Sequence, residues 1–375
     1  MQVSREAYRA TAIDLGLVAG VTIGLCTPVA AEEDPAVDSA AALEDGILAL
    51  RIEAKYDSAL LLARDLLAER RADPGAQPYE VGDAERLVAT LERVVGLSRE
   101  EQQKLADADF STIRIEKLCS EMNFLEAAAA AQEQLTLRRE VLGAEHPDVA
   151  TSLDKLACVL HDGHGAGQDI RYGDMNPESM LREALDMRRK LLEPQHPDIA
   201  SSAAHLASLL ADRGNYAAET EKLYREALAI RRQAGIPESD LLESMNDLLI
   251  LLVEQGGPNT DREIDALARE AKKLVRSSKA LIRCHVYSEP QQISRPERDY
   301  PQDALRGNRE GTVHVAALVG KDGEVKYAAV TMGVHESLNR DAVDKVKRYR
   351  FKPGRCDGRP VTIWCPDIPM EYMIH

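Results

Sequence analysis

Aromatic residues are scarce in this 375-residue chain. They make up 4% of the sequence, with a single tryptophan, whereas hydrophobic residues as a whole reach 44%. A composition with few aromatics and much alanine and leucine favours stacked helices over an all-β protein. A single hydrophobic core rarely grows beyond about 250 to 300 residues, so the length predicts two or three domains.

Positive charge is also in short supply. The chain has 47 Lys and Arg against 63 Asp and Glu, a formal net charge of -16. A nucleic-acid-binding surface needs an excess of Lys and Arg, so no nucleic acid is expected as a partner. The acidic excess lies before Ser288, since the charges nearly balance from there on. This shift indicates a domain boundary near Ser288.

Common catalytic motifs are missing. The sequence has no nucleotide-binding glycine motif, no nucleophile elbow and no His-Glu-x-x-His zinc site. His161 and His164 flank Asp162-Gly163, but two histidines without a third fixed ligand are more often solvent-facing. The chain is therefore predicted not to be an enzyme, with no catalytic residues, no cofactor and no metal.

Cysteines are few and widely spread. Five remain after an N-terminal leader is set aside, and no C-x-x-C pair occurs among them. An odd number excludes complete pairing within one chain, and the spread excludes a dense disulfide framework. Burial as small apolar residues is the simplest interpretation, and the pairing stays open. The five are Cys119, Cys158, Cys284, Cys356 and Cys365.

The N-terminus has only a short apolar run. Leu15 to Leu25 follows a basic start and precedes the small residues Val29-Ala30-Ala31. A bilayer span needs about 20 apolar residues, so this pattern predicts a signal peptide over 1–31 and a periplasmic protein. An uncleaved anchor that attaches the chain to the inner membrane, or a lipid on Cys26, are the alternatives.

Residues 32–109 are predicted to form a helical region. A helical apolar pattern runs from Leu43 to Arg71, and a second helix is expected from Asp83 to Val95. Ser98 and Glu101 have the spacing of a capping box, which predicts a further short helix that ends at Leu105.

Residues 110–287 contain internal repeats. The segments that begin at Leu135, Leu185 and Leu228 share a Leu-x-x-Arg-Arg pattern, and His146-Pro-Asp recurs as His196-Pro-Asp. The proline fits the first helical position and the aspartate favours the positive end of the helix dipole. Each unit is therefore predicted to be a helix pair that buries its apolar stripe against its neighbours, closed by a capping helix from Asp261 to Ile282.

These units resemble the tetratricopeptide repeats (TPR) of kinesin light chains and their bacterial relatives. The resemblance implies an all-α solenoid with a concave, peptide-binding face, on which the first helix of each unit places a pair of amide side chains. The corresponding positions here are Asp154, Lys155, His205, Asn246 and Asp247. A purely structural spacer is the other interpretation.

The last part of the chain, 288–375, has a different pattern. A short helix near Ala304-Leu305 precedes an alternating strand from Glu310 to Val319, a turn at Asp322-Gly323 and a returning strand. A helix from Ser337 to Tyr349 and a last strand from Pro360 to Tyr372 follow. Pro366 and Pro369 lack N–H donors, which places that strand at a sheet edge.

This pattern closely resembles the C-terminal domain of TonB-family proteins. It is carried by Tyr300-Pro301, Glu310-Gly311, Asp322-Gly323, Phe351-Lys352-Pro353 and Gly358-Arg359-Pro360-Val361. The resemblance implies an α+β domain in which a three-stranded antiparallel sheet packs on two helices and the last strand captures an extended peptide. The strand residues expected to bind a partner are Val361, Thr362, Ile363, Trp364, Cys365, Asp367, Ile368, Met370 and Tyr372.

The two patterns together predict an α+β multi-domain protein that binds other proteins in the cell envelope. A TonB-dependent outer-membrane receptor is the partner that the resemblance implies. Two alternatives stay open: an energy transducer of the TonB type that drives outer-membrane transport, and a scaffold that oligomerises or binds peptidoglycan.

Overall fold

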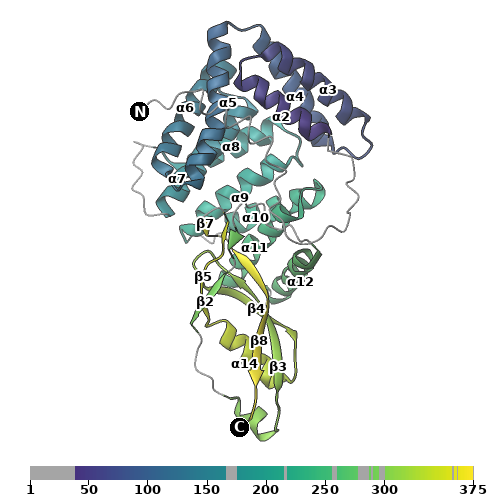
Figure 1. Cartoon of the computed structure of the whole chain (residues 1–375), viewed down its shortest axis with the longest axis vertical. Helices are drawn as coiled ribbons and strands as arrows, with labels where there is room; N and C mark the ends of the chain where they lie inside the picture. The colour runs from purple at the N-terminus through teal and green to yellow at the C-terminus, as the bar shows by residue number, and fades with distance from the viewer. Residues whose placement is uncertain are drawn as a thin grey trace, which may run out of the picture. The chain divides into compact units, whose positions relative to one another are not determined.

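The computed structural model describes residues 39–165, 175–214, 218–255, 260–277, 287–288, 290–294, 300–356, 359–360 and 362–374. The predicted leader 1–31 and Cys284 lie outside these residues. Leu43–His375 form one compact unit that contains both the helices and the sheets. The arrangement of this unit can be followed in Figure 1.

The first helices differ in detail from the sequence prediction. Helix α2 (Ser39–Ile52) and helix α3 (Tyr56–Ala72) replace the single helix expected to run to Arg71. The chain turns at Ala54, whose φ of 57° is left-handed, and the Lys55 N–H donates to the Leu50 carbonyl. An isolated left-handed residue ends a helix without breaking the apolar period, which explains why the pattern concealed the break.

Helices α4 and α5 are both longer than predicted. Helix α4 (Pro78–Val95) begins five residues before Asp83, with Pro78 in its first turn and a capping box between Gln77 and Glu80. Helix α5 (Arg99–Ser120) begins at the predicted capping box of Ser98 and Glu101 but continues past Leu105. The repeat that was expected to begin at Phe110 therefore begins inside a helix.

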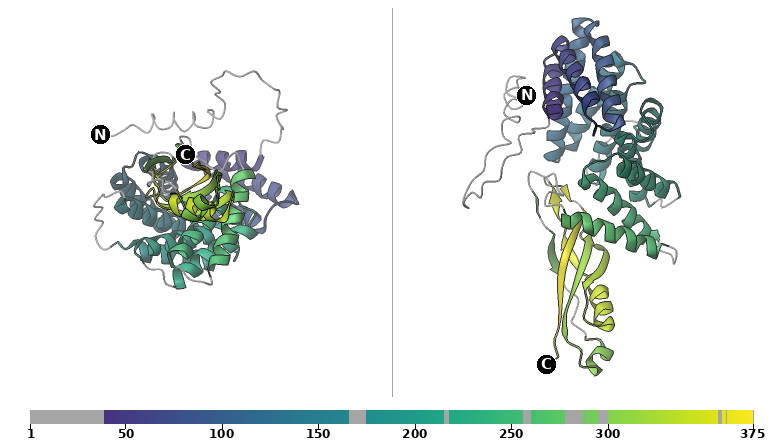
Figure 2. Two further views of the ribbon diagram at one scale, coloured as in Figure 1. Left: turned by 90° about the horizontal axis from the view of Figure 1, so that it is seen from below. Right: turned by 90° about the vertical axis from the view of Figure 1, so that its right-hand side faces the viewer.

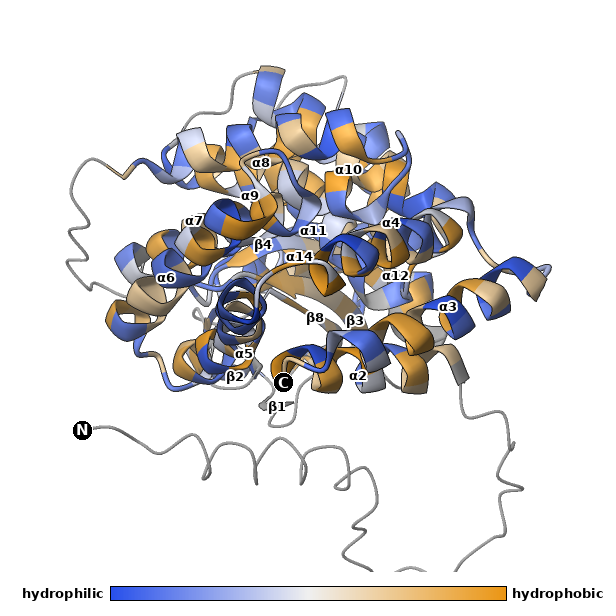
Figure 3. Cartoon of the chain, turned by 90° about the horizontal axis from the view of Figure 1, so that it is seen from above, coloured by the Kyte–Doolittle hydropathy of each residue, from blue (hydrophilic) through white to orange (hydrophobic). Residues whose placement is uncertain are grey.

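Helices α5 to α12 stack in chain order, each against its predecessor (Figure 1). Each carries a hydrophobic and a hydrophilic side (Figure 3), as expected of helices that bury one stripe. Two continuous apolar cores run through them. The remaining bounds are α6 (Phe124–Leu142), α7 (Pro147–Gly165), α8 (Pro177–Leu191), α9 (Pro197–Asp212), α10 (Ala218–Gln233), α11 (Glu238–Gln255) and α12 (Asp261–Ser277).

Histidine, as well as proline and aspartate, shapes the His-Pro-Asp turns. The His196 ring is the N-cap of α9: its Nδ1 accepts from the Asp198 N–H at 3.0 Å, while its Nε2 lies 2.9 Å from Asp83 of α4. His146 uses its Nδ1 in the same way and places its Nε2 3.2 Å from Thr90 Oγ1. Helix α4 therefore lies across the turns of successive repeats and ties the N-terminal helices to them.

The C-terminal part is an α+β domain, as predicted. Its main sheet has the strand order β4-β3-β8 and is antiparallel throughout, with β3 (Gly311–Val319) in the centre. Strands β4 (Val325–Met332) and β8 (Ile363–Tyr372) form the two edges. The two predicted helices are α13 (Gln302–Arg306) and α14 (Glu336–Val346), and α14 packs on one face of the sheet (Figure 2).

Two small antiparallel pairings accompany the main sheet and were not predicted. Strand β2 (Gln291–Ser294) pairs with β5 (Arg350–Lys352). Strand β6 (Arg355–Cys356) pairs with both β1 (Tyr287–Ser288) and β7 (Arg359–Pro360). These pairings bring the segment after α12 back to the segment after α14.

Gly323 fixes the hairpin between β3 and β4. Its φ is +80°, and a Cβ built on it would lie 1.9 Å from the Phe351 carbonyl oxygen. The Gly323 carbonyl in turn accepts from the Phe351 N–H at 2.9 Å. Only glycine fits here, because both the backbone angle and the close approach exclude a side chain.

Candidate interaction surfaces

Trp364 connects the last strand to the helical repeats. Its side chain is only 6% exposed and belongs to the same apolar cluster as Leu248 and Leu252 of α11. Its indole N–H donates to the Asn246 Oδ1 at 2.9 Å. Asn246 is the one amide among the predicted peptide-contacting positions, and in this structure it binds the chain's own tryptophan.

Further contacts surround Trp364. Tyr327 of β4 packs edge-on against the indole, with ring centroids 5.9 Å apart, and its hydroxyl lies 3.1 Å from a carboxylate oxygen of Asp265 in α12. Ala316 and Leu318 of β3 complete the apolar contact with the repeats. The end of the sheet near Trp364 is thus packed against α11 and α12.

The other predicted strand residues fall into two groups along β8. Ile363, Trp364 and Cys365 pair with the end of β3 that contacts the repeats, whereas Ile368, Met370 and Tyr372 pair with its beginning. Val361 lies outside the described residues, Thr362 is half-buried just before the strand, and of Asp367 only the backbone is described. Between the groups, the register shifts opposite Ala316, where Pro366 and Asp367 lie, whereas Pro369 stays in register opposite His314.

The half of β8 that begins at Ile368 has one buried and one exposed face. Ile368, Met370 and Tyr372 pack toward the domain core, while Pro369 and Glu371 are exposed. Tyr372 is held by a 2.6 Å hydrogen bond from its hydroxyl to Asp341. Among the described strands, none pairs with the outer side of β8.

Exposed apolar side chains gather near this end of the domain. Val334 lies against Gly311 at the start of β3, and Met332 pairs with His314 in the register of β3 and β4. Met373 follows the last residue of β8. These residues and Leu305 of α13 are 45% to 64% exposed.

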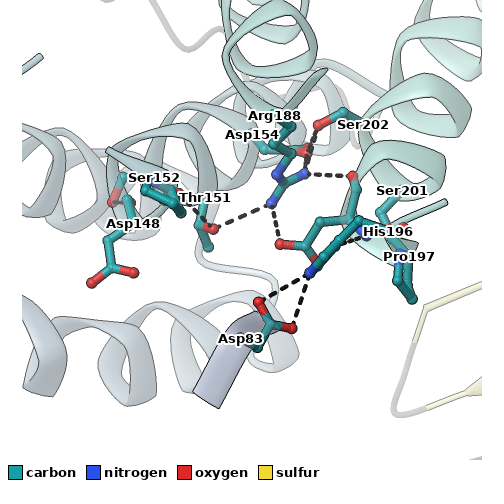
Figure 4. Close-up of polar contacts among 12 residues, drawn as sticks. Asp83, Asp148, Thr151, Ser152, Asp154, Arg188, His196, Pro197, Ser201 and Ser202 are labelled. Atoms are coloured by element: carbon teal, nitrogen blue, oxygen red, sulfur yellow. Dashed lines mark hydrogen bonds and ion pairs between the residues drawn. The ribbon is translucent and has the colours of Figure 1, made fainter. Parts of the chain in front are cut away.

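Asp154 is buried inside the repeats and does not face solvent directly. Its Oδ2 accepts from Arg188 Nη1 at 2.5 Å and from Ser202 Oγ at 2.6 Å (Figure 4). Its Oδ1 lies 2.6 Å from His205 Nδ1. Burial raises the pKa of Asp154, but His205 and Arg188 outweigh it and hold that pKa well below its ordinary value. Of the predicted concave-face residues, the fold brings Asp154 and His205 together.

Lys155 and Asp247 do not belong to this hydrogen-bonded pair. Lys155 forms an ion pair with Glu116 of α5 at 3.5 Å. Asp247 is half-buried, and burial together with the nearby Glu243 raises its pKa to about 7. Lys321, in the β3–β4 turn, acts in the opposite direction, which places a charge of the sheet domain near this carboxyl group.

The first arginine of each Leu-x-x-Arg-Arg segment connects its helix to the next one, a role that the sequence did not reveal. We call these three residues the latch arginines. Arg138, Arg188 and Arg231 are buried, and each donates to a serine hydroxyl and a backbone carbonyl of the next helix. The accepting serines, Ser152, Ser202 and Ser244, occupy equivalent places in α7, α9 and α11. Arg138 and Arg188 also bind a carboxylate, Asp109 and Asp154 respectively.

The second arginine points outward. Arg139, Arg189 and Arg232 form surface ion pairs with Glu183, Glu226 and Glu270, at 2.6 to 2.7 Å, on the second helix of the following unit. The doubled arginine therefore links successive units once inside and once outside. The repetition of the pair was the available signal, but only the packing shows that its members have different roles.

Comparison with known proteins agrees with this architecture. Residues 296–374 match the family described as Gram-negative bacterial TonB protein C-terminal. Residues 178–198 and 199–234 match the family described as Tetratricopeptide repeat. Both resemblances inferred from the sequence are thereby confirmed. No curated protein matches the chain significantly.

Solved structures of repeat proteins are similar to this chain at low sequence identity. BtubC (BKLC) from P. vanneervenii is 17% identical over 78% of this chain and 96% of its own, with a TM-score of 0.36. A Podosopora anserina putative kinesin light chain with nearly identical TPR-like repeats is 14% identical over 64% and 97%, with a TM-score of 0.32. The fold assignment rests on the helices and strands themselves.

The matched families are non-catalytic interaction domains, and the TonB C-terminal domain is a domain of the Gram-negative envelope. A role in binding other proteins follows from them. In the part of the chain described from residue 39 on, no helix combines the length and apolarity needed to cross a membrane.

Proposed function

We propose that this chain is a periplasmic interaction protein whose TonB-like domain captures an extended peptide by β-strand addition along Ile368–Tyr372. The observation that carries the proposal is the position of β8 at the edge of the β4-β3-β8 sheet. An edge strand presents backbone donors and acceptors to an incoming strand, and these give affinity for an extended chain of many sequences.

The half of β8 from Ile368 to Tyr372 is the better site. The other half carries Trp364, whose side chain is buried against α11 and whose neighbours contact α12. Met373, which is 60% exposed, directly follows this half of β8 and would cover part of the apolar side chains of a bound peptide.

The repeats serve in this proposal as the scaffold that holds the sheet domain. Their buried arginine latches give a stiff array, and Asn246 with the α11 cluster holds Trp364. Lys155 and His205 remain partly accessible for a second docking partner. We assign 32–109 to the N-terminal helices, 110–287 to the repeats and 288–375 to the TonB-like domain, exported by the leader 1–31.

A peptide selection on purified chain 32–375 tests the capture site. The selected peptide is expected to protect the backbone amides of Ile368–Tyr372 from hydrogen exchange. Replacement of the exposed Glu371 by Pro removes one edge donor and is expected to abolish binding, whereas Met332→Pro, at the opposite edge, leaves it intact. Protection of β4 alone, or loss of binding only in the β4 variant, would contradict the proposal.

Cell fractionation distinguishes the proposal from two other roles, an energy transducer and a cell-wall scaffold. A chain recovered from membranes with Leu15–Leu25 still attached would favour an energy transducer driven from the inner membrane. A chain that begins at Glu32 and is retained on purified peptidoglycan, with no peptide selected, would favour a cell-wall scaffold. Recovery in the soluble periplasm together with capture of a receptor segment supports the proposal.

A further inference from the structure

Three metal-ligating side chains come together between the first helices of two successive repeats. Asp154 and Cys158 lie one turn apart on the same side of α7, and His205 faces them from α9. One ligand atom of each lies within 4.8 Å of the others. His205 is 47 residues from Cys158 and 51 residues from Asp154 in the chain. The stacking of the helices alone brings the three side chains together.

The distances suit a small tetrahedral ion. Zinc bonds of about 2.0 to 2.3 Å imply ligand atoms separated by about 3.3 to 3.8 Å. Cys158 Sγ lies 3.6 Å from Asp154 Oδ1, within that range, while His205 Nδ1 lies at 2.6 Å from the same oxygen. The histidine ring would have to move by about 0.7 Å, which side-chain rotation of a partly exposed residue allows.

The surroundings orient the carboxylate for a ligand. Arg188 and Ser202 hold Oδ2 of Asp154, so its Oδ1 is the oxygen that faces Cys158 and His205. Such hydrogen bonds to a ligating carboxylate are the usual support of a metal site. The charges of Arg188 and Asp154 offset each other, and Asp162 and Asp247 are near enough to act on Cys158 and His205 respectively.

Cys158 and His205 are not demanded by the repeat. In the equivalent places of the neighbouring copy, Ser208 corresponds to Cys158 and Lys155 corresponds to His205. The buried Asp154 is explained by Arg188, as Asp109 is by Arg138, but the arginine latch uses neither the thiol nor the imidazole. The three ligand side chains therefore occur together only between α7 and α9 among the described repeats.

The site is open on the histidine side. The His205 side chain is 46% exposed, whereas that of Asp154 is 5% exposed, so an ion has access from solvent and a fourth ligand position faces outward. Sulfur, nitrogen and oxygen donors together favour zinc or a similar transition metal over Mg²⁺ or Ca²⁺. We propose that Asp154, Cys158 and His205 bind one Zn²⁺ ion, with the fourth position taken by water or a donor of a docked partner.

The arrangement is less suited to catalysis by Cys158. Burial raises the pKa of the Cys158 thiol, so the reactive thiolate is disfavoured without a metal. Burial lowers the pKa of His205, but the Cys158 sulfur and the Asp154 carboxylate outweigh it and raise that pKa well above its ordinary value. Zinc would displace the protons of both groups, so its affinity should rise with pH.

Zinc titration of the reduced, chelator-treated chain 32–375 tests this site. Calorimetry is expected to show one Zn²⁺ per chain, and Cys158→Ser and His205→Gln should each weaken binding by about tenfold or more, since each removes one of three protein ligands. His161→Gln and Cys365→Ser are the matched controls and should bind as the unchanged chain does. Circular dichroism confirms that each variant is folded.

Cobalt supplies a second measurement that does not depend on affinity. Co²⁺ bound to Cys158 should give a thiolate-to-metal charge-transfer band, and Cys158→Ser should remove that band while Cys365→Ser retains it. No stoichiometric binding by the unchanged chain, or a band that survives Cys158→Ser, overturns the proposal. In that case the pairing of His205 with Asp154 is purely structural.

Discussion

The repeats and the sheet domain are held together by different interactions. In the repeats, Arg138 and Arg188 lie within the array and donate to serines, carbonyls and carboxylates. In the described part of the sheet domain the core is almost wholly apolar, and Lys345 is the one charged residue counted as buried. The repeats thus depend on polar complementarity between helices, whereas the sheet depends on its backbone ladder and apolar packing.

The difference matters because buried polar contacts specify geometry more strictly than apolar ones. An arginine with several fixed acceptors permits one register between neighbouring helices, and a lost partner leaves a buried charge. An apolar core tolerates changes of similar volume. Substitutions should therefore be much more damaging at the latch arginines than at their outward-facing neighbours.

The largest expected effect is at Arg188. Arg188→Met removes the buried guanidinium from Asp154, which then keeps only His205 as a cationic partner, and should lower the free energy of unfolding by about 3 to 5 kcal/mol. Arg189→Met, the adjacent control, loses only a surface ion pair and should cost less than about 1 kcal/mol. Urea denaturation measures both. Equal losses in the two variants would show that the buried latch is not what distinguishes the repeats.

A smaller effect is expected at Trp364, where the two regions meet. Trp364→Ala removes a large buried side chain and should cost about 3 kcal/mol, mainly as detachment of the sheet domain from α11. Trp364→Phe keeps most of the packing but leaves the Asn246 oxygen without its donor, at about 1 to 2 kcal/mol. Hydrogen exchange along Leu248–Leu252 should rise in both, with Met373→Ala as an unaffected control.

Asp247 should make the stability of the repeats depend on pH. Its pKa in the folded chain, about 7, lies above the ordinary value of 3.8. The folded state therefore gains stability from the neutral carboxyl group below pH 4, and this contribution is lost as the pH rises through 7. Relative to the unchanged chain, Asp247→Asn should therefore have a free energy of unfolding that is higher at pH 8 than at pH 4 by on the order of 2 kcal/mol. Urea midpoints at the two pH values measure it. Parallel curves for variant and unchanged chain would refute the raised pKa.

The smallest expected effect is a difference in pKa between two histidines of the repeats, His146 and His205. Burial lowers the pKa of His146, so its contribution is present above its ordinary pKa of 6.5 and is lost as the pH falls. The raised pKa of His205 gives a contribution present below 6.5 and lost as the pH rises through the folded value. In the metal-free chain, NMR titration of the ring protons should show the two pKa values on opposite sides of 6.5. Coincident titrations would contradict both assignments.

Much of the fold could be predicted because the patterns that encode it are local. The His-Pro-Asp turns, the capping box at Ser98 and the Asp322-Gly323 hairpin each depend on a few adjacent residues, and all lie where expected. The boundaries that failed at Ala54 and Ser120 are those where the apolar period continues across a break or beyond an assumed stop, whereas α4 begins before Asp83 because Gln77 and Glu80 form its capping box. Periodicity alone does not locate such ends.

The sequence by itself determined the two modules and their order, because repeated motifs and turn residues act over short distances. The tertiary structure alone decided which side chains meet: Trp364 with Asn246, Arg188 with Asp154 and Ser202, and Cys158 with His205. These partners are 14 to 118 residues apart in the chain. Their contacts follow from how helices and strands stack, and that stacking depends on the apolar surface of the whole unit rather than on any one segment.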